Sequence, residues 1–337
     1  MAEADSLILE QRGGVAHLRL NRPRALNALD PAMISGIARS LAVWRNDASV
    51  RLVLVEGEGG RAFCAGGDIR HAREMLLAGD SAGLVGFLGE EYAMNGAIAA
   101  FPKPWVSLID GVCMGGGIGV SVHGSHRVVT EHAVLAMPET TIGLFPDVGT
   151  SFVLSRLPGA LGFWLGLTGA RLRGADAVEA GLATHFVPRE ALPALREALL
   201  AGDMDALGHA ASPVPPGPIA ALRPAIGRCF GAGTVPAIVA ALEAEDTDWA
   251  REQLAVLRRV SPTSLFVTHG MLSRARHLDL PACLAMDLAM IRTVTPYPDF
   301  AEGVRALLVD KDNAPRWTPA RIEDVSETTI AALFGGA

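Results

Sequence analysis

The sequences GVCMGGGIGVSVHG at residues 111–124 and MPETTIGLFPDVG at residues 137–149 decide how the rest of this chain is interpreted. An apolar, strand-like segment, Trp105 to Ile109, leads into the glycine run. A strand, a glycine turn and a helix start bring unpaired backbone N–H groups to one point, which can bind a phosphate, a carboxylate or an oxyanion. Glu139 and Asp147 follow among apolar and glycine neighbours. We therefore interpret this stretch as a candidate active site.

The composition narrows the class of protein. The chain has 337 residues, of which 50% are hydrophobic and 19% are charged, so it can build one large domain or two. Its net charge of −7 argues against a nucleic-acid partner, which needs a clustered basic face. The four cysteines are scattered without a Cys-x-x-Cys pair, so we expect reduced thiols and neither a disulfide framework nor a metal site.

Targeting and membrane signals are weak. Residues 1–5 are acidic and no apolar signal segment follows them, so we expect a cytoplasmic protein. The longest run of low charge, residues 106–122, is rich in glycine and contains Asp110, which makes it a poor membrane span.

Strand and helix patterns alternate through the first half, which favours an α/β layer architecture. The sequence predicts a hairpin over 6–20, helices over 31–45 and 86–100, and strands over 52–55, 106–109, 127–129, 134–136 and 184–187. Amphipathic helices are predicted over 219–230, 234–244, 247–259, 262–277 and 280–293. The proline-rich segment 212–218 is the strongest break, so we divide the chain into a core of 1–211 and a helical C-terminal region of 212–337.

A second glycine loop strengthens the interpretation of the first. In Gly66-Gly67-Asp68, Asp68 is a good N-cap for a helix that starts at Ile69, and that role alone explains the loop. Two separate glycine loops at strand ends, however, can bind one carbonyl oxygen from two sides. The loop at 115–117 supplies the second side.

Other nucleophiles have less support. Ser121 lies in a near match to the serine-hydrolase elbow, but His123 replaces the second glycine. Cys64 and Cys113 adjoin the glycine loops without a histidine neighbour, and we interpret both as packing residues. Glu139 and Asp147 can act as general base or as nucleophile, and as neighbours they would titrate as a pair with at least one raised pKa.

The chain resembles the crotonase (enoyl-CoA hydratase/isomerase) superfamily and, within it, the 3-hydroxyisobutyryl-CoA hydrolases. The superfamily likeness lies in residues 21–29 (NRPRALNAL), 63–68 (FCAGGD) and the glycine triplet. The hydrolase likeness lies in EEY at 90–92, MPET at 137–140, GLFPDVG at 143–149, SPTSL at 261–265, FAEGVRA at 300–306 and DKD at 310–312. It covers nearly the whole chain.

The resemblance implies a crotonase-like ββα spiral core with a helical C-terminal region, and an acyl-CoA substrate. It implies hydrolysis of a 3-hydroxyacyl-CoA, 3-hydroxyisobutyryl-CoA above all, as in valine catabolism. Coenzyme A is then part of the substrate, and no cofactor or metal is expected. It assigns catalysis to Glu139 and Asp147, and the oxyanion hole to Gly67 and Gly116. Substrate contacts fall on Glu91, Gly116, Glu139 and Asp147, and CoA contacts on Ala25, Ala65, Gly66 and Asp68.

One position separates the subclasses. Hydratases of this superfamily usually carry a second catalytic glutamate where this chain has Gly119, and often have glycine where this chain has Asp147. Glycine at position 119 together with aspartate at position 147 favours thioester hydrolysis over hydration. The departure from the hydrolase pattern is Thr150-Ser151, where further glycine is expected. The alternatives are an enoyl-CoA hydratase or isomerase, and a non-catalytic acyl-CoA-binding homologue. A homo-oligomer is possible.

Overall fold

The structure is a computed structural model that describes residues 5–335. By contact density it consists of two units, each assembled from three segments of the chain. Of the described residues, the first unit contains 5–67, 93–136 and 171–220, and the second contains 68–92, 137–170 and 221–335. This partition interleaves along the chain, whereas the sequence suggested a division between 211 and 212. The latter division stays a prediction.

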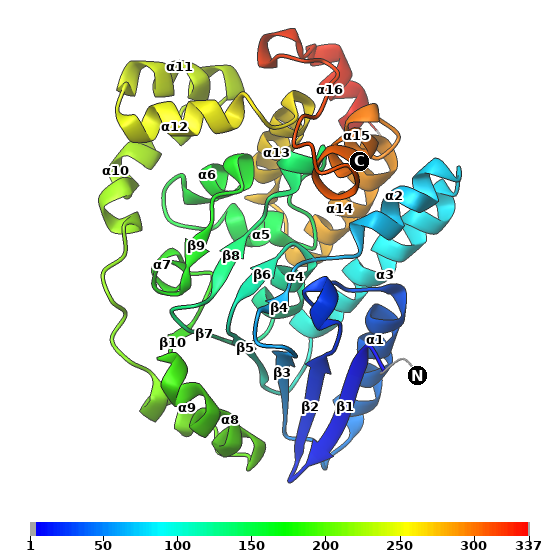
Figure 1. Cartoon of the computed structure of the whole chain (residues 1–337), viewed down its shortest axis with the longest axis vertical. Helices are drawn as coiled ribbons and strands as arrows, with labels where there is room; N and C mark the ends of the chain where they lie inside the picture. The colour runs from blue at the N-terminus through cyan, green and yellow to red at the C-terminus, as the bar shows by residue number, and fades with distance from the viewer. Residues whose placement is uncertain (1–4, 336–337) are drawn as a thin grey trace. The chain divides into compact units, whose positions relative to one another are not determined.

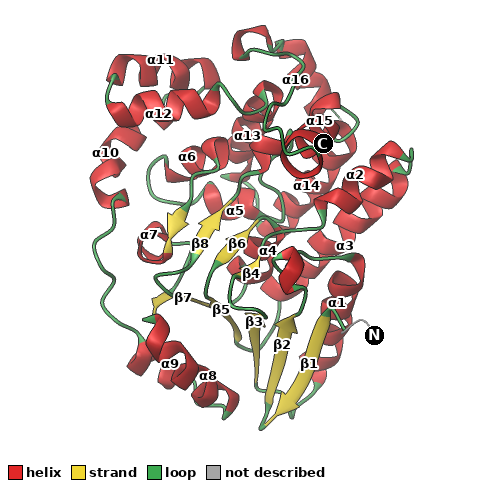
Figure 2. Ribbon diagram, viewed as in Figure 1, coloured by secondary structure: helices red, strands yellow, loops and turns green. Residues whose placement is uncertain are grey.

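Two sheets form the first unit, and Figure 2 shows their strands in yellow. The larger has the order β1-β2-β3-β5-β7-β10, and the smaller has the order β4-β6-β8-β9. The strands of the larger sheet are β1 (Leu7–Arg12), β2 (Val15–Leu20), β3 (Leu52–Gly57), β5 (Trp105–Ile109), β7 (His126–Val129) and β10 (His185–Phe186). Those of the smaller sheet are β4 (Ala62–Cys64), β6 (Val112–Met114), β8 (Val134–Ala136) and β9 (Leu172–Arg173).

The chain alternates between the two sheets. β3, β5 and β7 are parallel neighbours in the larger sheet, and each is followed by a parallel strand of the smaller one, β4, β6 and β8. A helical segment then follows each pair. Two strands and a helix per turn make the predicted ββα spiral, and the predicted fold class is confirmed.

The core of the larger sheet explains its long apolar runs. A cluster of buried aliphatic side chains joins one face of β2, β3, β5 and β7 to the helices α8 (Leu192–Leu200) and α9 (Ala206–Ala210). Val53 and Val55, which point to the opposite face of β3, are buried as well. Parallel strands that are covered on both faces have continuous apolar runs, as LVLV at 52–55 does. The first unit also contains η1 (Pro23–Ala25), α1 (Pro31–Asn46), α4 (Gly116–Val122), α7 (Gly174–Ala180) and η3 (Arg189–Ala191).

The second unit is helical. Its helices before residue 221 are α2 (Ile69–Leu77), most of α3 (Ser81–Ala99), η2 (Glu139–Ile142), α5 (Thr150–Leu154) and α6 (Leu161–Thr168). Those that follow are most of α10 (Ile219–Phe230), α11 (Val235–Glu245), α12 (Asp248–Leu257), α13 (Pro262–Ala275), α14 (Leu280–Val294), α15 (Pro298–Val304), the π-helical η4 (Arg305–Val309), η5 (Ile322–Asp324) and α16 (Glu327–Phe334). In Figure 1, α11 and α12 lie side by side as a helical hairpin.

Most predicted boundaries agree with the structure to within a few residues. Helix α10 begins and ends as predicted, and Asp30 caps α1 by accepting a hydrogen bond from Met33 N–H. The three-residue strands β4 and β6 were missed, because they lie inside stretches that the sequence presents as glycine loops.

Candidate active site

The two glycine turns lie against each other within the first unit. Gly66 has φ +119°, a conformation that favours glycine, and its carbonyl accepts a hydrogen bond from Leu29 N–H at 2.8 Å. A Cβ atom built on Gly66 would lie 3.7 Å from Gly116 N. The loop after β4 and the loop before α4 therefore meet, as two donors to one oxygen require.

Helix α4 begins at the second glycine turn. Gly115 caps it with φ +50°, and Gly116 is its first residue, so the Gly116 amide has no acceptor within the helix. A Cβ on Gly117 would lie 2.3 Å from the Cys64 carbonyl oxygen, a separation that no side chain tolerates. Glycine at 117 thus allows α4 to pack directly on the end of β4. The oxyanion-hole role of Gly67 and Gly116 stays a prediction.

Asn27 braces the first of these turns. It adopts φ +58°, and its side-chain amide donates hydrogen bonds at 2.9 Å to the carbonyls of Glu58 and Ala62. Ala65 N–H donates to the carbonyl of Leu26 at 3.0 Å. This network ties the predicted CoA-binding loop at Ala65 to the segment that carries Ala25.

The four residues predicted to contact CoA are distributed over both units. Ala25 is exposed at the end of η1, Ala65 is half-buried, and Gly66 is buried, all in the first unit. Asp68 begins the adjoining segment of the second unit, where it caps α2 by accepting a hydrogen bond from His71 N–H, as the sequence suggested. Their contacts with CoA stay a prediction.

Within the second unit, four buried carboxyl groups form what we call the acid cluster: Glu91, Glu139, Asp147 and Asp287. Glu91 lies on α3, Glu139 begins η2, Asp147 precedes α5, and Asp287 lies on α14. Their exposed fractions are 2%, 6%, 6% and 0%. No ion pair among the described residues involves any of them, so the cluster brings four carboxyl groups together without a partner cation. Three of the sequence-predicted site residues thus come together in one unit.

Backbone contacts hold Glu139 in place. It is the first residue of η2, and its carbonyl accepts a hydrogen bond from Leu144 N–H at 3.0 Å. The next residue, Thr140, accepts a bond from Ser261 N–H at 3.1 Å, which ties η2 to the start of α13. Glu139 Oε2 is buried without a hydrogen-bond partner among residues 5–335, as a carboxylate reserved for a ligand would be.

Asp147 lies in a strained turn. Tyr92 Oη donates a hydrogen bond to its Oδ2 atom at 2.7 Å. Its carbonyl accepts bonds from Thr150 N–H at 2.9 Å and from Thr150 Oγ1 at 2.7 Å. The following Val148 has φ +52°, a conformation that costs a β-branched residue on the order of 1–3 kcal/mol and persists only where the surroundings enforce it.

Burial sets the electrostatics of the acid cluster. It raises the pKa of Glu91 to about 8, with a further rise from the nearby Asp147 charge. It raises the pKa of Asp147 to about 6, although the Tyr92 hydrogen bond acts in the opposite direction. Burial first, and the Asp147 charge second, raises the pKa of Glu139 well above its usual range. Glu139 and Asp147 therefore titrate as a coupled pair in which burial raises the pKa of both carboxyl groups.

Sequence reasoning missed two members of this arrangement, Tyr92 and Asp287. Tyr92 stands beside Glu91 in the sequence, but nothing local indicates that its hydroxyl reaches Asp147. Asp287 is the only acidic residue in the apolar helix α14, and that isolation was the available signal.

The alternative nucleophiles are explained by packing. Ser121 donates back to carbonyls of its own helix, Gly117 at 2.9 Å and Ile118 at 3.1 Å, as serines inside helices do. Burial raises the pKa of the Cys113 thiol to about 12, which suppresses the thiolate. Cys64 is also fully buried. These residues fit the packing roles that the sequence suggested.

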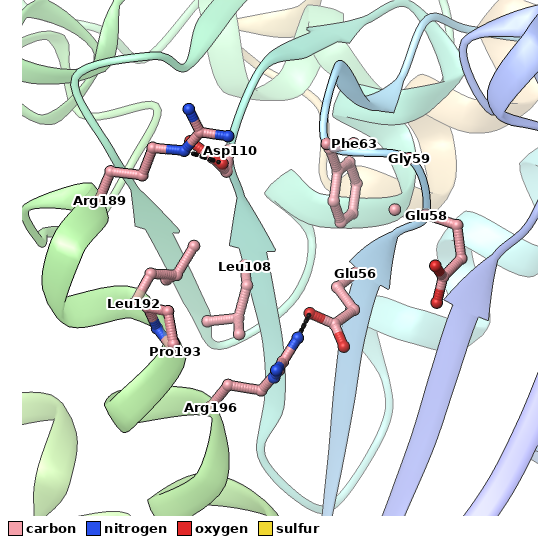
Figure 3. A pocket seen from close by; sticks show the side chains of 12 residues that line it. Glu56, Glu58, Gly59, Phe63, Leu108, Asp110, Arg189, Leu192, Pro193 and Arg196 are labelled. Atoms are coloured by element: carbon pink, nitrogen blue, oxygen red, sulfur yellow. Dashed lines mark ion pairs between the residues drawn. The ribbon is translucent and has the colours of Figure 1, made fainter.

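A separate pocket of about 300 Å³ opens in the first unit, between the ends of β3 and β5 and the start of α8 (Figure 3). Its charged walls are paired: Arg189 with Asp110 at 2.9 Å, and Arg196 with Glu56 at 4.0 Å. None of the sequence-predicted site residues lines it. We assign it no part in the site.

Between residues 5 and 335, no helix has both the length and the apolar character needed to cross a membrane. Among the same residues, no group of three or more His, Cys, Asp or Glu side chains is arranged to hold a metal ion.

Proteins named 3-hydroxyisobutyryl-CoA hydrolase are similar to this chain along nearly its whole length. It is 43% identical to the mitochondrial 3-hydroxyisobutyryl-CoA hydrolase of Rattus norvegicus, over 98% of this chain and 89% of the relative. The Homo sapiens protein of the same name gives the same figures. A probable 3-hydroxyisobutyryl-CoA hydrolase of Arabidopsis thaliana is 39% identical, over 99% of this chain and 92% of the relative.

Solved structures give the same fold under different titles. A carnitinyl-CoA dehydratase from Mycobacterium thermoresistibile superposes with a TM-score of 0.95 at 41% identity, covering 98% of this chain and 96% of that one. An enoyl-CoA hydratase from Rhodobacter sphaeroides superposes with a TM-score of 0.92 at 42% identity, covering 98% and 97%. The family profile described as enoyl-CoA hydratase/isomerase matches residues 15–334. This chain is therefore a member of the enoyl-CoA hydratase/isomerase, or crotonase, family.

Proposed function

We propose that the protein hydrolyses the thioester of a 3-hydroxyacyl-CoA, with 3-hydroxyisobutyryl-CoA as the first candidate, to the free 3-hydroxy acid and coenzyme A. The observation that carries this proposal is the buried Glu139–Asp147 pair with its two raised pKa values. The likeness to relatives named 3-hydroxyisobutyryl-CoA hydrolase, along almost the entire chain, supports the same substrate. With that substrate, the reaction would belong to valine breakdown.

The proposed chemistry needs an oxyanion site, a base and an acid. The amides of Gly67 and Gly116 would donate to the thioester oxygen as it becomes an oxyanion, an interaction usually worth about 2.7–4 kcal/mol per donor. Glu139 would either attack the carbonyl carbon or take a proton from the attacking water. Asp147 would orient the 3-hydroxyl or the water and manage the proton that the departing CoA thiolate receives. Overall, water adds across the C–S bond, and one acid and one thiol are formed.

The raised pKa of Glu139 makes this chemistry depend on pH. Burial and the Asp147 charge raise that pKa well above its usual range, so Glu139 keeps its proton to higher pH than an ordinary glutamate does. A base or nucleophile must be ionised, so we expect kcat/KM to rise with pH as Glu139 loses its proton.

The second candidate function is hydration or dehydration of an enoyl-CoA. The titles of the two solved structures at 41% and 42% identity favour it. Hydration needs acid and base groups arranged around one water and the α-carbon, and the position usual for the second hydratase glutamate holds Gly119, buried in α4. We therefore rank hydrolysis first.

One experiment separates the candidates. Purified protein is given 3-hydroxyisobutyryl-CoA with a thiol reagent, and in parallel crotonyl-CoA with detection of the enoyl absorbance. We expect free thiol to appear in step with 3-hydroxyisobutyrate, and no loss of enoyl absorbance. Enoyl turnover without thiol release would establish the hydratase alternative, and binding of both compounds without product would establish a non-catalytic homologue.

A matched pair of variants links the activity to Glu139. We expect Glu139→Gln to lower kcat by at least about 100-fold, the usual scale for a lost acid or base. Glu90→Gln, at an exposed glutamate of α3, should leave kcat unchanged. Near-normal turnover by Glu139→Gln would remove Glu139 from the mechanism.

A further inference from the structure

Asp287 is buried in an unusual way. It is the only acidic residue of α14, its side chain has no exposed surface, and no ion pair among the described residues involves it. Its Oδ2 atom accepts a hydrogen bond from Gly149 N–H at 2.7 Å, and its Oδ1 atom is buried without a hydrogen-bond partner of good geometry among residues 5–335, although the Ser151 hydroxyl lies close enough to act on the carboxyl group. A carboxyl group in such surroundings is costly to keep, so the contact that it makes needs a reason.

That contact reaches the turn that carries Asp147. Residues 148 and 149 both have left-handed backbone conformations, with φ +52° and +74°. Thr150 holds the Asp147 carbonyl from inside the turn, through its N–H and its hydroxyl. Asp287, which is 138 residues away in the sequence, holds the other side of the turn by accepting the hydrogen bond from the Gly149 amide. Because Val148 is strained in this conformation, loss of the Asp287 contact should let the turn relax.

The groups that face Asp287 make it part of the acid cluster. Tyr92 from α3, Asp147 from the turn, Ser151 from α5 and Cys283 from its own helix surround it, and none of these is a cation. Burial and the Asp147 charge raise the pKa of Asp287 well above its usual range. Asp287 thus keeps its proton to higher pH than an ordinary aspartate does, and its Oδ2 atom can accept the Gly149 bond in either protonation state.

We propose that Asp287 is a positioning residue: by holding the Gly149 amide it fixes the left-handed turn and thereby sets where the Asp147 carboxyl group points. The inference rests on the proposed part of Asp147 in acyl-CoA turnover. It assigns to α14 a function in the reaction that passes through Asp147, without contact between Asp287 and the reacting atoms being required.

The test uses Asp287→Asn and Asp287→Leu in the full-length protein. Asn keeps an oxygen that can accept the Gly149 bond, whereas Leu has a similar size and no acceptor. We expect Asp287→Asn to stay within about threefold of wild-type kcat. We expect Asp287→Leu to lose about 10–100-fold in kcat with little change in KM. Equal losses in the two variants would show that the Gly149 bond is not the function of Asp287.

A double-mutant cycle decides whether the effect passes through Asp147. If Asp287 acts only by placing Asp147, the double variant Asp147→Asn/Asp287→Leu should be no slower than Asp147→Asn alone. Losses that multiply would contradict the proposal, since they would indicate two independent effects.

A control variant separates positioning from general stability. In the first unit, Asp176 is also a buried carboxyl group that accepts one distant backbone amide, from Ile219 at 3.2 Å. We expect Asp176→Leu to lower the melting temperature without changing the kcat of the folded protein. If Asp176→Leu lowers kcat as much as Asp287→Leu does, the loss in both variants reflects stability and the proposal is wrong.

Hydrogen exchange keeps the inference testable even if the proposed reaction fails. Exchange of backbone amides in a peptide spanning residues 144–152 reports on the turn without any substrate. We expect faster exchange there in Asp287→Leu and wild-type exchange in Asp287→Asn. Unchanged exchange in Asp287→Leu would overturn the positioning role, whereas absence of thiol release by the wild type would overturn only the proposed hydrolysis.

Discussion

Tyr92 Oη donates a hydrogen bond to Asp147 Oδ2 at 2.7 Å, and both side chains are buried. The contact joins α3 to the turn before α5, residues that are 55 positions apart. It stabilises the ionised form of Asp147, because a donor to a carboxylate lowers its pKa while burial raises it. Tyr92 therefore tunes the acid that the proposed reaction needs.

Removal of the Tyr92 hydroxyl should raise the pKa of Asp147 above about 6. A hydrogen bond to a charged group is worth about 1.5–3 kcal/mol, which corresponds to roughly one to two pH units. We expect Tyr92→Phe to shift the limb of the kcat profile that reports the titration of Asp147 toward higher pH. Tyr297→Phe, at the only other tyrosine in the chain, is the matched control and should shift nothing. A superimposable profile for Tyr92→Phe would show that Asp147 does not set that limb.

Stability should fall as pH rises, because burial gives Glu91 a folded-state pKa of about 8, against 4.5 for an ordinary glutamate. Between these values the folded protein binds more protons than the unfolded chain, so the free energy of unfolding decreases with pH. The stabilisation is complete below about pH 4.5 and is lost as pH rises through about 8.

Urea unfolding at pH 6 and pH 9 measures this effect. We expect a lower midpoint at pH 9, and a smaller difference between the two pH values in Glu91→Gln. The neighbouring exposed residue supplies the control, since Glu90→Gln should keep the full difference. A Glu91→Gln difference as large as that of the wild type would mean that Glu91 is already ionised in the folded protein.

Turnover should survive the loss of the buried thiol beside the glycine turn. Burial raises the pKa of Cys113 to about 12, so almost no thiolate exists at neutral pH. We expect Cys113→Ala to keep wild-type kcat, with a loss of stability of about 1 kcal/mol from the small cavity. Iodoacetamide at pH 7 should likewise leave the native enzyme active. Inactivation by the reagent that Cys113→Ala prevents would revive the thiol as a nucleophile.

The sequence could predict those site residues that lie close together in the chain, but not those that tertiary packing brings together. Glu139 and Asp147 lie eight residues apart between prolines and glycines, so their pairing was visible in one short segment. The bond from Asp287 to Gly149 spans 138 residues and reflects how α14 packs, which no periodicity records. Tyr92 was quoted only as part of a motif, because the direction of its hydroxyl follows from tertiary packing.

The same distinction between local sequence patterns and long-range contacts applies to the fold. Continuous apolar runs predicted the buried strands β3 and β5, since their composition alone indicates a covered sheet. β4 and β6 have three residues each, too few to display an alternation. They form because parallel neighbours supply their hydrogen bonds, β6 pairing with both β4 and β8. The interleaved units likewise arise from contacts between distant segments, so a break in composition at 212–218 could not indicate them.

Packing between the glycine turns leaves no room for a side chain at residue 117. A Cβ there would lie 2.3 Å from the Cys64 carbonyl and 2.9 Å from the Cys64 Cβ, both in buried surroundings that cannot yield easily. Gly117→Ala should therefore push α4 away from β4 and displace the Gly116 amide, and we expect kcat to fall by at least about 100-fold, as on loss of one oxyanion donor.

Gly86→Ala is the matched control for that substitution. Gly86 lies on the exposed side of α3 with nothing within 4 Å of an added Cβ, so alanine there should stabilise the helix by about 0.5–1 kcal/mol and leave kcat unchanged. Steady-state kinetics beside thermal unfolding distinguishes the two variants. A folded Gly117→Ala protein with wild-type kcat would show that turnover does not depend on the Gly116 amide, and the oxyanion site would have to be sought elsewhere.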